Sequence, residues 1–286
     1  MRHALHTRWI PDEKLEEWLR EDSYPLDLTS FALNIHGKAI ARIITREKCV
    51  VACTEEAAQL YLLAGADKIA YIVNTGTVAV PGQTVLEVIG DAYSLHKAWR
   101  VAQTLIAVFS GIATRTRRFV DLIRKHSSKT VLATTRKTMP GLRPLYIKSV
   151  IAGGGTPHRL GLYDSILVFP NHKRLIKYND VKELVRLIKQ VFPEKPVTIE
   201  AKSVEEAIEI IDAGADAVQL DKLPPSKVKV IVHYIKQKRQ STKIIVAGNI
   251  GLDNIEEYAR LEPDIIVSSA PYYGKPIDIT TTIEMI

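Results

Sequence analysis

From about residue 130 onward, short apolar segments alternate with stretches in which apolar residues recur at helical spacing. The apolar segments predict strands at Thr130–Ala133, Ser165–Phe169, Pro196–Ile199, Ala215–Leu220, Lys243–Ala247 and Asp264–Val267. The intervening patterns predict helices at Asp180–Val191, Ser203–Ala213, Ser226–Lys238 and Leu252–Leu261. Strands that are apolar almost throughout, alternating with helices, are typical of a parallel sheet whose faces are covered by helices.

Polar residues follow each of these predicted strands. They are Thr135, Arg136 and Lys137, then Asn171 and His172, Glu200, Asp221 and Lys222, Gly248 and Asn249, and Ser268 and Ser269. In an α/β barrel the carboxyl ends of the strands form the active-site face. The pattern therefore favours an α/β fold with an incomplete, open barrel. A doubly wound sheet is the alternative that spacing alone leaves open.

The first hundred residues have a different texture. Gly37–Ala52 and Lys68–Ile89 are rich in β-forming residues, and Glu55–Leu63 predicts a short helix. Ser94–Lys125 predicts a long helical segment that we expect to be broken near Gly111. We therefore expect an N-terminal α+β sandwich domain over residues 1–110, on which the C-terminal tail packs back, and a barrel domain over 111–286.

Composition narrows the class of protein. A hydrophobic content of 46% with 25% charged residues is ordinary for a globular domain. No apolar run approaches membrane-spanning length and no signal-peptide core is present, so we expect a cytoplasmic protein without a membrane partner. The net charge of +7 fits anionic substrates. Basic residues between Pro224 and Lys243 alternate with apolar ones as on a solvated helix face, and no nucleic-acid-binding motif is present.

A glycine-rich loop with basic neighbours is the strongest chemical signal. Gly153, Gly154 and Gly155 stand between Arg136 and Lys137 on one side and His158 and Arg159 on the other. Consecutive glycines let the backbone approach a ligand closely, and the basic side chains supply donors for phosphate or carboxylate oxygens. The segment predicts a site for a small anion.

Motifs along nearly the whole chain resemble the quinolinate phosphoribosyltransferase family (nicotinate-nucleotide pyrophosphorylase, carboxylating). In chain order they are Asp27–Ser30, Arg100, Ser110–Thr114, Thr135–Thr138, Pro140 and Gly141, Gly153–Gly155, His158 and Arg159, Asn171 and His172, Glu200, and Leu220 and Asp221. The resemblance implies transfer of phosphoribosyl from phosphoribosyl pyrophosphate (PRPP) to a heterocyclic nitrogen, with release of pyrophosphate.

The resemblance also implies roles for individual residues. Glu200 and Asp221 would be catalytic, serving the ribose hydroxyls and Mg²⁺. The acceptor and pyrophosphate would be bound by Arg100, Thr135, Arg136, Lys137, His158, Arg159 and Phe169. Barrels often bind phosphate at the loops after their last strands, which places the 5′-phosphate at Gly248, Asn249, Ser268 and Ser269. In the family, the Arg matched by Arg100 reaches into a neighbouring subunit's site, which implies a homodimer.

Departures from the family pattern cluster on the acceptor side. Phe169 stands where the family has Lys, Pro157 and Lys222 stand where it has Asn, and Trp99 stands where it has Glu. These features resemble the ModD-like branch, whose members accompany molybdenum-transport genes. Replacing Lys by Phe removes a counter-charge for a carboxylate, so we expect a less anionic or more aromatic acceptor.

Other interpretations stay open at this stage. Lys222 or a cation from a partner chain could restore the lost charge, which would leave a quinolinate phosphoribosyltransferase making nicotinate mononucleotide for NAD biosynthesis. A non-catalytic protein binding a nucleotide or molybdate is a third possibility. For single residues, Glu200 and Asp221 could be N-caps or surface ion pairs, and His158 an ordinary core histidine.

Overall fold

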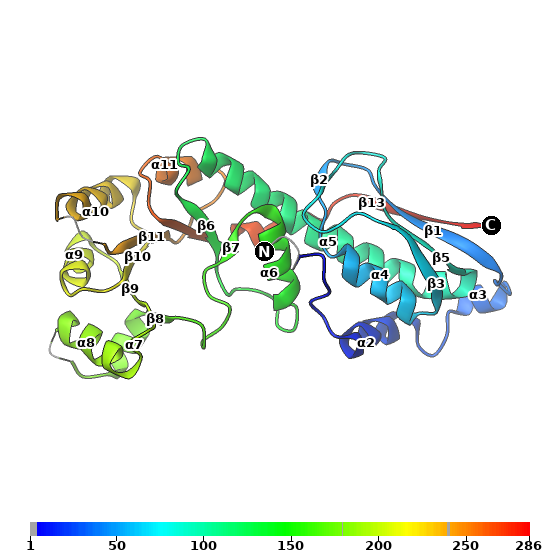
Figure 1. Cartoon of the computed structure of the whole chain (residues 1–286), viewed down its shortest axis with the longest axis horizontal. Helices are drawn as coiled ribbons and strands as arrows, with labels where there is room; N and C mark the ends of the chain where they lie inside the picture. The colour runs from blue at the N-terminus through cyan, green and yellow to red at the C-terminus, as the bar shows by residue number, and fades with distance from the viewer. Residues whose placement is uncertain (1–4, 179, 239–240) are drawn as a thin grey trace. The chain divides into compact units, whose positions relative to one another are not determined.

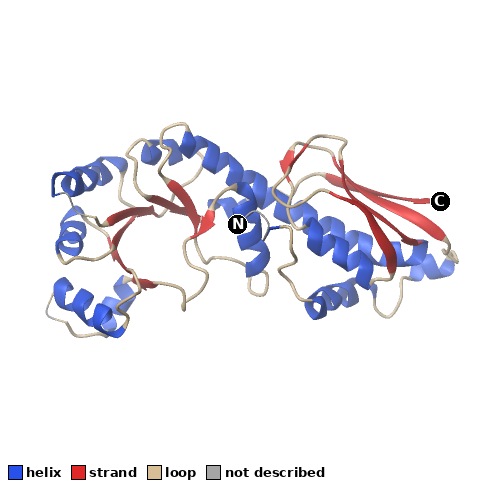
Figure 2. Cartoon of the chain, viewed as in Figure 1, coloured by secondary structure: helices blue, strands red, loops and turns tan. Residues whose placement is uncertain are grey.

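The computed structural model describes residues 5–178, 180–238 and 241–286. The chain folds into two compact units, which are assembled from non-contiguous segments. Of the described residues, unit 1 comprises those up to 117 together with 138–154 and 271–286, and unit 2 comprises those within 118–137 and 155–270. Figure 1 shows the order of the helices and strands, and Figure 2 distinguishes helices, strands and loops by colour. No helix among the described residues has both the length and the apolar content needed to cross a membrane.

Unit 1 is built on an antiparallel four-stranded sheet in the order β13-β1-β5-β3. Its strands are β1 (Lys38–Thr45), β3 (Ala66–Ile72), β5 (Thr84–Asp91) and β13 (Ile279–Met285), and β2 (Cys49–Val50) pairs separately with β4 (Val78–Ala79). The helices are α2 (Asp12–Ser23), α3 (Leu28–Ala32), α4 (Thr54–Leu63), α6 (Arg143–Gly153) and most of α5 (Ala92–Arg124). The core joins apolar residues of the sheet, such as Val88, to Leu60 of α4 and Leu95 of α5.

The last residues of the chain complete this sheet. β13 runs antiparallel to β1, with Ile43 opposite Thr281, and becomes its edge strand. Just before this strand begins, the backbone contacts α5, where Ile277 N–H donates to the Ala107 carbonyl over 3.0 Å. A Cβ placed on Gly111 would lie 2.3 Å from the Lys275 carbonyl oxygen.

The prediction that the long helix breaks near Gly111 is wrong. α5 is continuous over 33 residues. Glycine costs only about 1 kcal/mol within a helix, which packing of a long amphipathic helix outweighs. Glycine is needed at position 111 because the backbone of residues 274–276 packs against it, and a side chain there would leave no room for that backbone.

A charge network lies in the interior of unit 1. Lys148 of α6 is completely buried, and its ammonium donates to Glu55 Oε2 over 3.0 Å and to Glu56 Oε2 over 2.7 Å. Burial opposes the charged form of Lys148, but the carboxylates of Glu56 and Glu55 outweigh it and raise its pKa. Thr75 donates to Glu55 from its backbone N–H over 2.9 Å and from its hydroxyl over 2.5 Å. This cluster is a structural element of unit 1.

Unit 2 contains a parallel seven-stranded sheet in the order β7-β6-β12-β11-β10-β9-β8. The strands are β6 (Val131–Thr134), β7 (Thr156–Pro157), β8 (Ile166–Val168), β9 (Val197–Ala201), β10 (Ala217–Asp221), β11 (Lys243–Ala247) and β12 (Ile265–Ser268). From β8 to β12 each strand adds on the same side of its predecessor, and β12 then pairs with β6. Because the order never reverses, the doubly wound alternative is excluded, and the open barrel is confirmed with its gap between β7 and β8.

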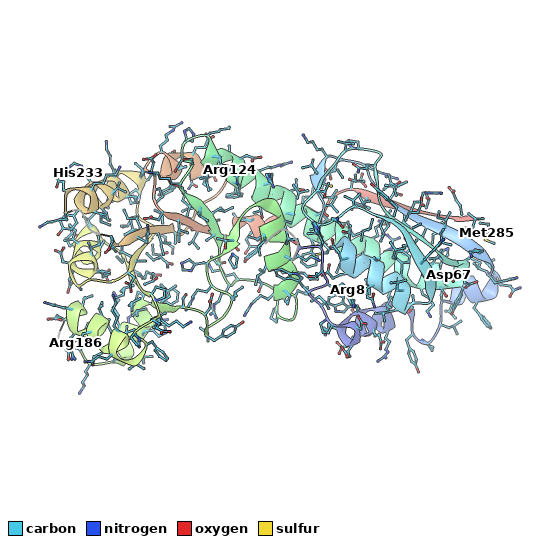
Figure 3. The ribbon with its side chains drawn as sticks, in the orientation of Figure 1. Arg8, Asp67, Arg124, Arg186, His233 and Met285 are labelled. Atoms are coloured by element: carbon cyan, nitrogen blue, oxygen red, sulfur yellow. The ribbon has the colours of Figure 1, made fainter. Side chains whose placement is uncertain are left out.

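The helices of unit 2 cover one face of this sheet (Figure 2). They are α7 (Pro170–Leu175), α8 (Val181–Val191), α9 (Val204–Asp212), α10 (Pro225–Lys238) and α11 (Ile255–Ala259), together with the end of α5. Polar residues on their outer faces, such as Arg186 and His233, project away from the sheet (Figure 3). Most of the basic stretch before Lys243 therefore lies on the exposed side of α10, while residues 239 and 240 lie outside the described residues.

Strand residues alternate between the helix-covered face and the barrel interior, as the two-residue period of a strand requires. In β10, Val218 and Leu220 belong to the core shared with the helices, whereas Ala217 belongs to a smaller cluster on the other face. The same alternation assigns Gln219 to the interior, and Glu200 of β9 is its partner in the parallel register. The sheet thus brings a polar pair into the barrel.

Candidate active site

A buried carboxylate and a strand-end carboxylate form one side of the site. Glu200 is only 7% exposed, and Gln219 Nε2 donates to its Oε2 over 3.1 Å. Burial, followed by the negative charge of Asp221 at the end of β10, raises the pKa of Glu200. Asp221 therefore lies close enough to destabilise the charged form of Glu200, which is an arrangement that a bound cation relieves.

The donor set fits Mg²⁺ better than a metal held entirely by protein. Within the described parts of the chain, no group of three or more His, Cys, Asp and Glu side chains is placed to hold a metal ion. Mg²⁺ keeps several waters and uses one or two carboxylates together with substrate phosphates. Glu200 and Asp221 supply such a pair at neighbouring strand ends.

Basic residues follow β6 and β7. Arg159 is 7% exposed, and its guanidinium donates to the Ser165 carbonyl over 3.3 Å. Burial and the positive charge of Arg136 lower the pKa of Arg159. Two arginines held within electrostatic reach of each other favour an anion between them. The structure thus brings together these two predicted site residues.

His158 is held beside them by its backbone, whose N–H donates to the Thr134 carbonyl over 2.9 Å. Burial, and after it the charge of Arg159, lowers the pKa of His158 to about 4. The imidazole is therefore neutral near pH 7, so it offers a hydrogen bond to a ligand but no positive charge.

Phe169 places an aromatic face next to Arg159. It follows β8 and is the N-cap residue of α7, where its backbone N–H donates to His172 Nδ1 over 3.0 Å. The Arg159 guanidinium carbon lies 5.8 Å from the centroid of the Phe169 ring, within cation–π range. The His172 ring lies 5.9 Å from the same centroid. This side of the site therefore combines an arginine with an aromatic surface.

The loop after β11 has left-handed backbone geometry and is held to the segment after β12. Gly248 and Asn249 both have positive φ, of 89° and 54°. Ser268 is 4% exposed, and its hydroxyl donates to the Ile250 carbonyl over 2.6 Å while accepting from Ala270 N–H over 3.0 Å. Ser268 therefore fixes the two loops to each other, and Ser269 is the more exposed of the two predicted serines.

The remaining predicted residues are less closely tied to this group. Lys137 is exposed, and its backbone N–H donates to the hydroxyl of half-buried Thr135 over 3.3 Å. Arg100 belongs to unit 1, where it is exposed on α5 and stacks on its neighbour Trp99, with the guanidinium carbon 3.9 Å from the ring centroid.

Sequence reasoning missed two residues that surround Glu200. Gln219 was visible as an amide inside an otherwise apolar strand, but its partner depends on the register between β9 and β10. Lys173, on the unpredicted helix α7, donates to the Glu200 carbonyl over 3.2 Å and also pairs with Glu206. Nothing in the local pattern indicated that contact.

An open α/β barrel with acids at the ends of β9 and β10 and arginines after β6 and β7 is an arrangement suited to a polyanionic substrate. The model of the quinolinate phosphoribosyl transferase N-terminal domain matches residues 27–110, and the model of the C-terminal domain matches residues 112–282. The chain belongs to the quinolinate phosphoribosyltransferase family, which confirms the resemblance seen in its motifs. It is accordingly a phosphoribosyltransferase, a pentosyl-transferring enzyme.

Relatives of two kinds match nearly the whole chain. A Pasteurella multocida protein named "Putative pyrophosphorylase ModD" is 32% identical, covering 96% of this chain and 98% of its own. A Methanocaldococcus jannaschii protein, named as a probable carboxylating nicotinate-nucleotide pyrophosphorylase, is 32% identical over 90% of this chain and 91% of its own. The chain is thus similar both to ModD proteins and to nicotinate-nucleotide pyrophosphorylases.

Solved structures agree with this assignment. The nicotinate-nucleotide pyrophosphorylase from Francisella tularensis superposes with a TM-score of 0.87 at 28% identity, covering 96% of this chain and 98% of that one. The NadC structure from Streptococcus pyogenes gives a TM-score of 0.88 at 27% identity, covering 98% and 99%. Both units of the chain therefore have counterparts in known enzymes of the family.

Proposed function

We propose that this enzyme is a ModD-like phosphoribosyltransferase whose acceptor is an aromatic heterocycle carrying fewer negative charges than quinolinate. The ring nitrogen of the acceptor attacks C1 of PRPP, the bond from C1 to the pyrophosphate oxygen breaks, and pyrophosphate leaves with its electron pair. The observation that carries the proposal is the pairing of Arg159 with the Phe169 ring, beside a neutral His158.

The acids serve the donor side of this reaction. Positive charge develops on the ribose in the transition state, and preorganised negative groups stabilise such charge most when they are shielded from water. Glu200 and Asp221 would hold the ribose hydroxyls and Mg²⁺, and the ion supplies positive charge to the phosphate oxygens of PRPP when bound. Gln219 fixes one oxygen of Glu200, which leaves the other available for these contacts.

The basic residues serve the leaving group and the acceptor. Arg136 and Lys137 would meet the negative charge that grows on pyrophosphate, and Thr135 would hold their loop. Gly248, Asn249 and Ser269 would bind the 5′-phosphate through their backbone and hydroxyl groups, with Ser268 as the support of the loops. We further propose that the enzyme acts as a homodimer in the cytoplasm and that Arg100, which is exposed on unit 1, completes a partner's site.

The charges on the acceptor side favour one carboxylate over two. Arg159 provides a permanent cation, His158 is uncharged at neutral pH, and Phe169 provides an apolar surface. A second carboxylate buried here without a partner would cost several kcal/mol. A heterocyclic monocarboxylate that stacks on Phe169 satisfies the site without this penalty.

Pyrophosphate release tests the proposal. The purified enzyme is supplied with PRPP and Mg²⁺ and with quinolinate, nicotinate or other nitrogen heterocycles in turn. We expect release with an acceptor other than quinolinate and its loss in Glu200→Gln. Glu209→Gln, which changes an exposed glutamate of α9, serves as the matched control and should leave release unchanged. Robust turnover of quinolinate by the wild type, abolished by Arg159→Ala, would instead identify a quinolinate phosphoribosyltransferase. Mg²⁺-dependent PRPP binding without release for any acceptor would support a non-catalytic protein.

A further inference from the structure

Lys222 adopts a backbone conformation that is unfavourable for lysine. It follows β10 directly after Asp221, and its φ of 59° lies in the left-handed region. A non-glycine residue there is strained, and such strain persists where the surrounding structure imposes it. The constraint is a hydrogen bond of 2.7 Å from the Lys222 N–H to the Ala247 carbonyl, at the end of the neighbouring strand β11.

The side chain of Lys222 is directed by the same turn. A Cβ placed on Gly248 would lie 2.5 Å from Lys222 Cγ and 2.8 Å from Asp221 Oδ1. The lysine stem therefore crosses the glycine that begins the loop after β11. Gly248 itself has a φ of 89°, so both the conformation and the lack of space exclude a side chain at this position.

The ammonium of Lys222 forms no ion pair within the part of the chain that the structure describes, although the Asp221 carboxylate borders the same glycine. Among the described residues, none of the ion pairs within 4.0 Å involves Lys222. The Lys222 side chain is exposed. The adjacent loop of Gly248 and Asn249 is supported by Asn254, whose Nδ2 donates to the Asn249 carbonyl over 2.9 Å. A lysine with a strained backbone and no ion-pair partner contributes little to the stability of the fold, but its free ammonium beside this loop can bind an anion.

We infer that Lys222 binds the 5′-phosphate of the phosphoribosyl donor, as a specificity-determining residue on the loop of Gly248 and Asn249. This inference rests on the proposed function and extends it, since it adds a charged side chain to a phosphate site otherwise made of backbone and hydroxyl groups. A phosphate monoester carries nearly two negative charges, and an ammonium is a suitable point-charge donor for it. The contact with Gly248 favours this phosphate over the acceptor carboxylate.

Binding of two partial ligands tests the assignment without requiring turnover. Titration calorimetry is used with ribose 5-phosphate and, separately, with inorganic pyrophosphate, on the wild type, Lys222→Met and Lys222→Arg. A charge-assisted contact contributes about 1.5–3 kcal/mol, so Lys222→Met should weaken ribose 5-phosphate binding about 10- to 100-fold. Pyrophosphate binding should stay the same, and Lys222→Arg should retain most of the affinity for ribose 5-phosphate. Lys229→Met, on the exposed face of α10, is the matched control and should change neither affinity.

A second variant separates binding from folding. Lys222→Gly removes the charge and also the backbone strain, so its thermal midpoint should rise while ribose 5-phosphate binding weakens. Unchanged ribose 5-phosphate affinity in Lys222→Met, or a loss confined to pyrophosphate, overturns the assignment and leaves the proposed function intact. A wild type that binds neither ribose 5-phosphate nor PRPP overturns both.

Discussion

Lys148 of unit 1 and two charged residues of unit 2, Glu200 and Arg159, are all buried, but they are partnered differently. The ammonium of Lys148 contacts Glu55, Glu56 and the Thr7 carbonyl, and Glu56 also accepts from the Trp9 N–H over 2.9 Å. Opposite charges meet, and their remaining hydrogen-bonding groups are occupied. The network joins the first residues of the chain to α4 and α6.

In unit 2, like charges are held together instead. Asp221 destabilises the ionised form of Glu200, and Arg136 destabilises the protonated form of Arg159. Such pairs oppose folding, and a ligand of the opposite charge would relieve them, which is why perturbed pKa values of this kind point to a candidate functional site. In this protein, a buried charge that is paired with opposite charges belongs to a structural cluster. A buried charge that lies beside a like charge, as Glu200 and Arg159 do, belongs to the candidate site.

Removing the centre of the paired network should have the largest effect on stability. Lys148→Met would leave Glu55 and Glu56 buried without a cation, which typically costs about 3–5 kcal/mol. Chemical denaturation should show this loss, while turnover per folded molecule stays near the wild-type value. Lys68→Met, an exposed lysine of β3, is the control with little effect. A loss under about 1 kcal/mol would mean that the network does not stabilise unit 1.

Glu200→Gln should show the opposite behaviour. Loss of one preorganised charged group at a reacting centre typically costs a factor of about 10²–10³ in turnover. The unfolding free energy should stay the same or increase, because the substitution removes a buried charge that faces Asp221. Parallel denaturation and pyrophosphate-release assays measure the two effects. A stability loss like that of Lys148→Met would show that Glu200 belongs to a structural network.

Phe169→Lys should sharpen the contrast by adding a cation to the acceptor side. The new ammonium would offset a second acceptor carboxylate, and we expect kcat/KM for quinolinate to rise about tenfold, equivalent to about 1.4 kcal/mol. Phe192→Lys, at an exposed position after α8, controls for added surface charge. If quinolinate turnover is unaffected while turnover of other acceptors is also preserved, Phe169 does not contact the acceptor.

The smallest expected effect concerns His158. Its folded-state pKa of about 4 lies below the ordinary value of 6.5, so between these values the unfolded chain binds more protons. The unfolding free energy should therefore rise with pH across this window, by no more than about 1.4 kcal/mol per pH unit. His158→Gln should flatten the rise, and His233→Gln, on the exposed face of α10, should not. Urea titrations at several pH values measure the slopes, and equal slopes in wild type and His158→Gln would contradict the assigned burial.

The strands of unit 2 and their polar ends were predictable because each apolar run is buried on both faces and stops at the active-site edge. The prediction for Lys243–Ala247 coincides with β11. The two residues of β7 were not predictable, since so short a strand has no periodicity of its own. α7 was missed for a similar reason, because its six residues contain none that is buried.

Contacts between distant parts of the chain could not be predicted from local sequence patterns. The sequence places Lys148 near the glycine run, but its partners lie 93 and 92 positions earlier. Glu200 and Asp221 were identified through motifs, whereas the hydrogen bond from Gln219 depends on strand register. The interruption expected at Gly111 was wrong because a single residue's helix propensity says nothing about the segment packed against it.

The edge position of β13 has a consequence for synthesis. Unit 1 combines β1, β3 and β5 with β13, which follows unit 2 in the chain, so its sheet stays incomplete until β13 has been synthesised. Until then β1 exposes a row of unpaired backbone groups, which other chains can pair with. Unit 2 is encoded almost entirely between these segments and can form its sheet earlier. Pairing with β13 then covers the backbone groups of β1, and β13 takes over the edge of the sheet.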